Sequence, residues 1–550
     1  MHEITSEAVP SVDFKGIRCI EDYSEICQDY SPYLCDESKL AHQGAQYLFF
    51  PTNEGELSAI FKEMSKKNVS VTLSGARTGL VGGAVPYGGA IVSLERFDKI
   101  LGLRYDTQSK EWLVRAECGV TIRDLNNWAM KKVFPGLFES GSAETKAFLE
   151  RYKESETTYF YPPDPTEMGA ALGGTVSTNA SGARTYRYGA TRNWVRWIRV
   201  MLASGEVLEI PRGKYLATPA GEFTIINSAG KKTIVKIPKY AMPHTKNAAG
   251  IFTAPNMDLI DLFIGSEGIL GAITEIEVAL QKWNNPVSIV QFLPSDDKAI
   301  DFVITLRKEK GVRPEFIEFY SSHALDLLRK KQKEDPKVVG MPPIPDYATS
   351  AVFFDLQFDP ENKDNDYAKL EEIVSKCGST LTRSWAGYER RDLERFKNFR
   401  HVLPETINTI IAERKKKIPE LYKLSTDLAV PDHALEEIWG FYTSILEGAG
   451  LEWVAFGHIG NNHIHINIIP GSLKEMKEGL SIYRKFAKKA VDLGGTISAE
   501  HGIGKIKKEF FSIMFSDKEL KEMKAVKNAL DPDCMLNPGN IFDIATDSHR

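Results

Sequence analysis

The sequence predicts a soluble globular protein built from both strands and helices, and three observations support this prediction. Short apolar strands alternate with amphipathic helices in the first half of the chain, and a second region of strands and helices covers residues 287–495. The hydrophobic fraction of 42% and the charged fraction of 26% are ordinary for a globular protein that buries a sizeable core. At 550 residues, the chain corresponds to about three domains or to one large composite fold.

The predicted elements of the first half follow from apolar spacing and turn chemistry. Residues 54–67 carry apolar side chains at helical spacing and are expected to form an amphipathic helix. Thr121 is a helix N-cap candidate with Asp124 three residues on, which opens a helix to about Lys132. Residues 196–210 are expected to form a hairpin that turns at Ser204-Gly205. Short strands are expected at 47–50, 69–73, 90–94 and 112–116.

Two segments show little periodicity and are expected to be loop-like insertions. Residues 136–160 are charged and weakly apolar, and residues 211–256 mix Pro, Gly, Lys and Asn. Loops of this length are typical of functional lids or decorations.

Composition also excludes several classes of protein. The net charge of −5 does not favour nucleic-acid binding, which usually needs a basic surface. The sequence contains no run of about 18 apolar residues, so a transmembrane segment is not expected. The N-terminus lacks the features of a signal peptide. The six cysteines form no CxxC pair, so a disulfide framework, a zinc ribbon and an iron–sulfur cluster are not expected. We therefore expect a cytoplasmic protein, with peripheral membrane association left open.

Three glycine-rich segments lie in the first half of the chain. The first, Ser74-Gly-Ala-Arg-Thr-Gly79-Leu-Val-Gly82-Gly83, directly follows a predicted strand, and the others span 173–182 and 265–271. Glycine-rich turns let consecutive backbone N–H groups point into one concavity, which suits a diphosphate. A plain turn explains one such segment, but three favour an extended phosphate-containing cofactor. Because no Rossmann fingerprint is present, we expect a flavin dinucleotide rather than a nicotinamide.

Late histidines form the sharpest pattern in the sequence. In residues 462–469, isoleucines alternate with His463, His465 and Asn467, so a strand would place the three polar side chains on one face. His458 precedes them across a glycine- and asparagine-containing turn, and Glu500-His501 lies in a later glycine-rich loop. Two or three imidazoles with a carboxylate suit zinc, iron or manganese. Hydrogen-bonded structural histidines are the plainer alternative, but the clustering favours a metal site.

Arg400 is a further candidate, on a predicted helix before Pro404. A substrate carboxylate needs a forked donor of this kind, although an arginine on a helix is more often part of a solvated face.

These segments, in this order, resemble the FAD-linked 2-hydroxy acid dehydrogenases of the p-cresol methylhydroxylase/vanillyl-alcohol oxidase flavoprotein superfamily. That group includes D-lactate dehydrogenase, the glycolate oxidase large subunit and D-2-hydroxyglutarate dehydrogenase. The resemblance covers roughly residues 45–545 apart from the two insertions. It rests on seven collinear motifs: SGARTGLVGGAVP, YPPDPTEMGAALGGTVSTNASGART, FIGSEGILGAIT, STDLAVP, FGHIGNNHIHIN, GGTISAEHGIGK and LDPDCMLNPGNIF.

The resemblance implies a two-subdomain FAD-binding fold of the p-cresol methylhydroxylase type, with an α+β cap domain built on an antiparallel sheet. The expected division is an N-terminal extension at 1–45, an FAD-binding domain at 46–285 containing both insertions, a substrate-binding cap at 286–495, and a segment at 496–550 that returns to the FAD domain.

The resemblance also implies the cofactor contacts. It places the FAD diphosphate on Ser74, Gly75, Ala76, Arg77, Thr78, Gly79 and Leu80, and further contacts on Gly173, Gly174, Ser177, Asn179, Gly182, Gly265, Ser266, Gly268, Ile273 and Asn537. Some superfamily members bond the flavin covalently to a histidine in an S-G-G-H version of the first loop. Arg77 stands at that histidine's position here, so non-covalent FAD is expected.

In metal-dependent members of the family, two histidines and a glutamate bind zinc. These positions correspond to His458, His465 and Glu500, with His501 as the base and with Asn467 and Arg400 as substrate contacts.

The chain departs from the family pattern in two places. Asn461-Asn462-His463 replaces Asp-Gly-Asn, which leaves His463 as either an extra ligand or a neighbour. The family's lysine before the STDLAVP-like segment has no clean match, because Ser425 stands at the aligned position and Lys423 lies nearby.

The resemblance therefore implies metal-assisted oxidation of a small (R)-2-hydroxy acid, with hydride transfer to the flavin. The electrons would leave to an external acceptor, such as an electron-transfer flavoprotein, an iron–sulfur subunit or a quinone. A homodimer is left open. The alternatives are an alkylglycerone-phosphate-synthase-like flavoenzyme, which Glu500-His501-Gly502 speaks against, and a non-catalytic flavin subunit of a larger complex.

Overall fold

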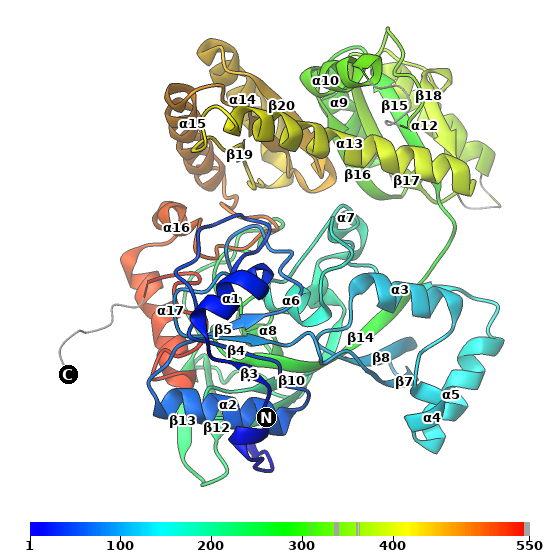
Figure 1. Cartoon of the computed structure of the whole chain (residues 1–550). Coiled ribbons are helices and arrows are strands. Elements are labelled where there is room, and N and C mark those ends of the chain that lie inside the picture. The colour runs from blue at the N-terminus through cyan, green and yellow to red at the C-terminus, as the bar shows by residue number, and fades with distance from the viewer. Residues whose placement is uncertain (310, 335–339, 359–360, 362, 544–550) are drawn as a thin grey trace.

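The computed structural model describes residues 1–309, 311–334, 340–358, 361 and 363–543. The chain forms two bodies, with the N-terminal half in the lower one and most of the C-terminal half in the upper one (Figure 1). A single strand, β14 (Ala272–Lys282), runs through the lower body and leads into the upper one. Within the described residues, no helix combines the length and apolarity needed to cross a membrane.

The first sheet of the lower body has four strands in the order β3-β4-β6-β5. Its strands β4, β6 and β5 are parallel, as their connections by helix and loop require. The predicted helix at 54–67 is confirmed, because it forms α2 (Glu54–Lys66) and buries its apolar face against the core. The strands are β3 (Cys19–Ile20), β4 (Tyr47–Phe49), β5 (Val71–Ser74) and β6 (Ala90–Ser93), and helix α1 (Tyr23–Asp29) precedes β4.

The second sheet of the lower body is antiparallel, in the order β2-β11-β10-β14-β8-β7. The predicted hairpin at 196–210 is confirmed, since β10 and β11 pair antiparallel across Ser204-Gly205. The predicted cap is also confirmed, because the Thr121 hydroxyl accepts a hydrogen bond from the Asp124 N–H at the start of α3 (Ile122–Lys131). The remaining strands are β2 (Glu7–Ala8), β7 (Ile100–Asp106), β8 (Glu111–Glu117), β10 (Val195–Met201) and β11 (Glu206–Pro211).

Neither low-periodicity segment is a plain loop, contrary to expectation. Residues 136–160 contain α4 (Leu137–Ser140), α5 (Ala143–Glu154) and β9 (Tyr159–Phe160). Helix α5 buries only Leu149 and Tyr152, so its apolar period is too weak to recognise in the sequence. Residues 211–256 contain β12 (Glu222–Ile226) and β13 (Lys232–Lys236), which form a three-stranded sheet with β1 (Glu3–Thr5).

The upper body is built on a seven-stranded sheet in the order β18-β15-β17-β16-β20-β21-β19. Every pairing in this sheet is antiparallel, as the family resemblance implied. Helices α10 and α13 pack on one face of this sheet, and α9 and α14 contribute to the core on the other. The strands are β15 (Val287–Leu293), β16 (Pro314–Tyr320), β17 (Ser350–Leu356), β18 (Ser384–Gly387), β19 (Leu424–Ser425), β20 (Trp453–Gly457) and β21 (His465–Ile468). The helices are α9 (Asp296–Lys308), α10 (Ser322–Glu334), α12 (Lys363–Lys376), α13 (Arg390–Lys415), α14 (Leu435–Ala449) and α15 (Leu473–Asp492).

Two features of this region bear on the site. Helix α13 continues through Pro404 and does not stop before it, so Arg400 lies within a long helix. After α15 the chain returns to the lower body, where α16 (Lys508–Met514) and α17 (Asp517–Leu530) lie (Figure 1). The predicted C-terminal segment includes residues 544–550, which lie outside the described residues. The division into an FAD domain and a cap stays a proposal, and the two bodies support it.

Candidate functional site

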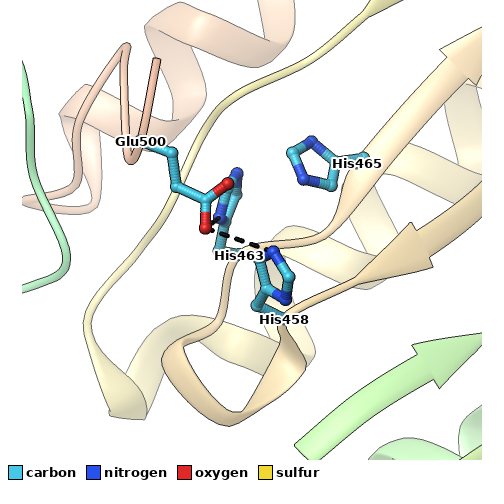
Figure 2. Close-up of side chains that lie close together, drawn as sticks. All are labelled: His458, His463, His465 and Glu500. Atoms are coloured by element: carbon cyan, nitrogen blue, oxygen red, sulfur yellow. Dashed lines mark ion pairs between the residues drawn. The ribbon is translucent and has the colours of Figure 1, made fainter. Parts of the chain in front are cut away.

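The predicted histidines and glutamate meet at one end of the upper sheet. His458 follows β20, His465 opens β21, and the register that pairs Phe456 with His465 brings the turn between the strands back on itself. Glu500 reaches the same point from the loop after α15 (Figure 2). One potential ligand atom from each of His458, His463, His465 and Glu500 lies within 4.8 Å of the others.

Strand alternation is the local reason for this arrangement. Ile464, Ile466 and Ile468 are no more than 2% exposed and pack into the core, as predicted. His463 and His465 therefore point to the opposite face, with ring centroids 4.3 Å apart. The extra histidine that departs from the family pattern thus joins the cluster.

Each imidazole has at least one ring nitrogen that faces a polar group. The His465 Nδ1 lies 2.8 Å from the Thr426 carbonyl oxygen, so this nitrogen donates and Nε2 is left free. The His463 Nε2 lies 3.0 Å from Asp427 Oδ1, and its Nδ1 faces Glu500 Oε1 at 3.8 Å. The His458 Nε2 approaches Glu500 Oε1 to 3.1 Å.

The charge states of His463, His465 and Glu500 suit a divalent metal. His458 differs from the other two histidines, because burial alone would lower its pKa but Glu500 raises it. Burial lowers the pKa of His463 to about 4 and that of His465 well below its usual value, so both imidazoles are neutral. Burial alone would raise the pKa of Glu500, but His458 and Lys246 hold it well below its usual value. Neutral imidazoles and an ionised carboxylate are the forms that bind metal.

Buried ring nitrogens without a hydrogen-bond partner also fit a metal at this cluster. They are both nitrogens of His463 and the Nδ1 of His458, among the described residues, although such atoms are normally satisfied. The Lys246 ammonium forms a buried ion pair with Glu500 and donates to the Gly182 carbonyl oxygen. Lys246 shares Glu500 Oε1 with His458 and His463, whereas Glu500 Oε2 faces His501.

His501 lies beside the cluster, with 23% of its side chain exposed. Its ring stacks on that of His465 at 5.8 Å between centroids. The Nδ1 atom is 3.5 Å from Asp427 Oδ2, and Nε2 is 4.0 Å from Glu500 Oε2. Burial lowers the pKa of His501, so its imidazole is neutral near pH 7 and able to accept a proton.

The other predicted substrate contacts lie around the same sheet face. The Arg400 Nη2 atom is 3.0 Å from Glu318 Oε1, so this guanidinium is paired with a carboxylate that sequence reasoning did not identify. Asn467 is buried and pairs with Ser425 across β21 and β19. Lys423 lies immediately before β19, and burial lowers its pKa.

Three functional candidates were missed by the sequence analysis: Asp427, Glu318 and Lys246. Asp427 is fully buried and accepts hydrogen bonds from the backbone N–H groups of Glu500 and His501, so it holds the loop that presents both residues. The only sequence signal for Asp427 was its place in the STDLAVP motif. Lys246 lies in a segment expected to be an insertion, where nothing distinguished it from other lysines.

A polar cavity of about 610 Å³ opens next to the cluster. Lys246 lines one side of it, and Asn461 and Asn462 of the turn after His458 line another. Asn461 and Asn462, which stand where the family has Asp-Gly, therefore line a cavity beside the candidate site.

The first glycine-rich segment turns sharply out of β5. Ser74 is fully buried at the end of that strand, and Arg77 adopts a left-handed conformation with φ of 59°. The Arg77 guanidinium donates to the Gly75 carbonyl oxygen and lies over the Tyr33 ring. Leu80, at the end of the predicted diphosphate contacts, is 48% exposed.

The first part of the second glycine-rich segment forms a short helix, α6 (Leu172–Ser177), where a loop was expected. A Cβ atom on Gly174 would meet nothing within 4 Å, whereas one on Gly173 would lie 2.5 Å from the Cβ of Cys118. Gly174 thus leaves backbone open to a ligand, and Gly173 serves packing. A second short helix, α7 (Thr185–Tyr188), follows this segment.

The third segment lies between α8 (Ile260–Phe263) and β14 and joins the other two. The Glu267 N–H donates to the Ser177 carbonyl oxygen of the second segment. Asn537 accepts from the Leu73 N–H and donates to the Glu267 carbonyl oxygen, which ties the C-terminal chain to β5, just before the first segment, and to the third segment. The three segments thus gather in one region, as a shared cofactor requires. The cofactor contacts of individual residues stay a prediction.

Comparison with known families identifies both halves of the chain. A family model described as "FAD binding domain" matches residues 45–145 and 150–211, and one described as "FAD linked oxidases, C-terminal domain" matches residues 284–541. Together these matches span most of the chain and support FAD as the cofactor.

Curated relatives match almost the whole length of the chain. A D-lactate dehydrogenase of Anaerostipes hadrus is 28% identical, covering 89% of this chain and 88% of that protein. A D-2-hydroxyglutarate dehydrogenase of Stutzerimonas stutzeri (strain A1501) is 25% identical, covering 90% of each. The glycolate oxidase subunit GlcD of Bacillus subtilis (strain 168) is 26% identical, covering 90% of this chain and 88% of that protein.

Among solved structures, an alkyldihydroxyacetonephosphate synthase matches with a TM-score of 0.58 and 14% identity, covering 97% of this chain and 90% of that one. At this identity the match establishes the fold alone.

Proposed function

Because the chain belongs to the FAD-linked oxidase family, we propose that it oxidises a small (R)-2-hydroxy acid of the lactate, glycolate or 2-hydroxyglutarate type to the 2-oxo acid. The observation that carries the proposal is the buried cluster of three histidines and Glu500, with His501 beside it. FAD would supply the hydride acceptor, and a divalent metal, zinc foremost, would supply the Lewis acid that lowers the pKa of the substrate hydroxyl.

We assign proton acceptance to His501. Its Nδ1 faces Asp427, so Nε2 is the nitrogen that carries the free lone pair and faces the cluster. Asp427 is ionised: burial alone would raise its pKa, but His501 and Lys507 hold it well below its usual value. An anion at this position fixes the tautomer of His501 and stabilises the imidazolium once the proton has been accepted.

Substrate orientation is assigned to Arg400 and Asn467. A guanidinium presents five N–H donors in a fixed fork, so a contact with Glu318 leaves others for the substrate carboxylate. Asn467 lies two residues from His465 on the same strand face and offers an amide to the same region. The metal ligands proposed are His458, His465 and Glu500, and the cluster adds His463 as a fourth candidate.

The electrons are proposed to leave to an external acceptor, which would be an electron-transfer flavoprotein, an iron–sulfur subunit or a quinone. The six cysteines are free and scattered, so they support no cluster within this chain. We propose non-covalent FAD, because Arg77 stands where a covalent histidine would be needed.

Anaerobic mixing of the purified flavoprotein with a panel of (R)- and (S)-2-hydroxy acids tests the proposal. Bleaching of the flavin absorbance by one (R)-acid, and its absence with the (S)-acid, is the expected result. A flavin that stays oxidised with every acid in the panel would refute the proposal and favour a non-catalytic flavin subunit.

A further inference from the structure

Glu318 is a buried carboxylate on β16 that the proposed mechanism does not yet use. All seven residues of this strand are buried, and Glu318 is 3% exposed. A carboxylate in such a place is costly to the fold unless cationic or donor groups surround it. The groups that contact Glu318 therefore indicate its role.

Three groups from three parts of the chain converge on Glu318. The His458 Nδ1 and the Arg400 Nη2 each lie 3.0 Å from Glu318 Oε1. The hydroxyl of Tyr320 donates to the other oxygen at 3.2 Å. One carboxylate thus contacts a proposed metal ligand and the proposed clamp for the substrate carboxylate.

The contact with His458 defines which nitrogen faces the cluster. With Nδ1 directed at Glu318, the opposite nitrogen, Nε2, is the one that lies 3.1 Å from Glu500. A carboxylate on the outer nitrogen of a ligating histidine fixes the ring and increases its basicity as a ligand. His465 and His463 use Thr426 and Asp427 for the same purpose, so Glu318 completes the set.

The contact with Arg400 restricts a side chain that would otherwise have several rotamers. Arg400 lies on α13, and its side chain reaches β16. There its guanidinium carbon also lies 6.0 Å from the centroid of the Phe316 ring. A guanidinium held in place before the substrate binds loses less conformational entropy on forming a bidentate contact.

We propose that Glu318 is a positioning residue that holds both His458 toward the metal and Arg400 toward the substrate carboxylate, so that the metal site and the substrate clamp depend on one side chain. This inference rests on the proposed function, since it takes the metal cluster and Arg400 as the working parts of the site. It goes beyond that function by adding a residue, 140 positions before His458, that touches neither reacting group.

The test is Glu318→Gln in the full-length flavoprotein, which keeps the size of the side chain and removes its charge. The matched control is Glu315→Gln. Glu315 is fully buried on the same strand and faces Arg184 at 3.6 Å and the Tyr188 hydroxyl at 2.9 Å. Both variants remove one buried negative charge from β16, but only Glu318 contacts the site.

Two readouts separate positioning from general stability. Zn²⁺ affinity, measured by competition with a chromophoric chelator, should fall about 10- to 100-fold in Glu318→Gln and stay at the wild-type value in Glu315→Gln. At saturating Zn²⁺, the KM for the 2-hydroxy acid should still be raised in Glu318→Gln, because Arg400 has lost its partner. Equal Zn²⁺ affinity in the wild type and both variants would overturn the inference.

The result also distinguishes this inference from the proposed function. If the wild type binds Zn²⁺ and its flavin is bleached by a 2-hydroxy acid, but Glu318→Gln behaves like its control, then only the role of Glu318 is refuted. If the wild type neither binds Zn²⁺ nor is bleached, both fail. Should Glu318→Gln not fold, Tyr320→Phe removes one donor to Glu318 and should weaken Zn²⁺ binding in the same direction, and unchanged affinity in that variant would refute the proposal.

Discussion

Replacing His501 with asparagine tests the proposed proton acceptor most directly. Asparagine removes the imidazole but keeps the backbone N–H that donates to Asp427 Oδ2 at 3.0 Å, so the loop that carries Glu500 retains its anchor. His501 has 23% of its side chain exposed, so its removal leaves a smaller packing defect than removal of a fully buried histidine would. Loss of activity without loss of folding is therefore the expected pattern.

The expected magnitude follows from general-base catalysis. Loss of a positioned base costs about 10²–10⁴ in rate, which corresponds to about 2.7–5.4 kcal/mol of transition-state stabilisation. The wild-type rate of flavin reduction should also rise with pH through a midpoint below 6.5, because burial lowers the pKa of His501 and the base acts in its neutral form. His501→Asn should lose this rise together with the rate.

Anaerobic stopped-flow measurement of flavin reduction across pH 4.5–9 checks both expectations. His433→Asn is the control, because His433 is exposed and lies outside the cluster. Flavin content and the unfolding midpoint of each variant confirm that the fold is intact. A rate within twofold of the wild type in His501→Asn, with an unchanged pH profile, would refute the assignment of His501 as the base.

Three further predictions address the loop, the metal and the cofactor. Asp427→Asn leaves the Lys507 ammonium buried without its anion and should destabilise the protein by about 3–5 kcal/mol in urea unfolding at pH 7. Because the pKa of Asp427 is lowered in the folded state, this difference from wild type should shrink as pH falls through that pKa, and a difference independent of pH would contradict the reasoning. Removal of metal, verified by elemental analysis, should slow flavin reduction, with Zn²⁺ restoring it, and full activity in the metal-free protein would exclude the Lewis-acid role. Gly174→Ala should weaken FAD binding and leave the unfolding midpoint of the apoprotein unchanged or raised, because alanine favours a helix and meets no neighbour there. Gly173→Ala should instead destabilise the fold by about 1–3 kcal/mol through overpacking against Cys118, so equal effects of the two substitutions would contradict these separate roles.

Features defined by neighbours in the sequence were predictable. The Thr121 cap and the hairpin around Ser204-Gly205 depend on residues within a few positions of one another, so the sequence contains the whole cause. The polar face formed by His463 and His465 follows in the same way from the two-residue period of a strand. The shared face of His463 and His465 was therefore predictable from the sequence, whereas the residues that contact them from other parts of the chain were not.

Helix α6 shows where local propensity fails. Gly173 and Gly174 both disfavour a helix, by roughly 1 kcal/mol each relative to alanine, and the segment was expected to be a loop. The close approach of Gly173 to Cys118 leaves no room for a side chain, so tertiary packing selects glycine and sets the helix despite its poor propensity. A single sequence does not contain the position of that neighbour.

Long-range contacts explain the residues that were missed. Glu318 meets His458 only because Phe319 on β16 pairs with Gly457 on β20, a register that depends on the folded sheet. Lys246 lies 254 positions before its ion-pair partner Glu500 and in a segment without periodicity. Neither position carries a spacing that distinguishes it from a surface charge, so charge type alone could not identify either residue.

Lys246 links the region expected to bind FAD to the proposed metal cluster. Its ammonium donates to the Gly182 carbonyl oxygen, in the glycine-rich segment expected to line FAD, and pairs with Glu500 in the proposed metal cluster. Glu500 in turn sits on the loop that Asp427 anchors to the upper sheet. A displacement of the upper body relative to the lower one would therefore strain two buried contacts of Glu500. These are its ion pair with Lys246 and the hydrogen bond from its backbone N–H to Asp427. Because buried ion pairs are costly to break, metal ligation and the distance between the cofactor region and the substrate region are expected to be set together.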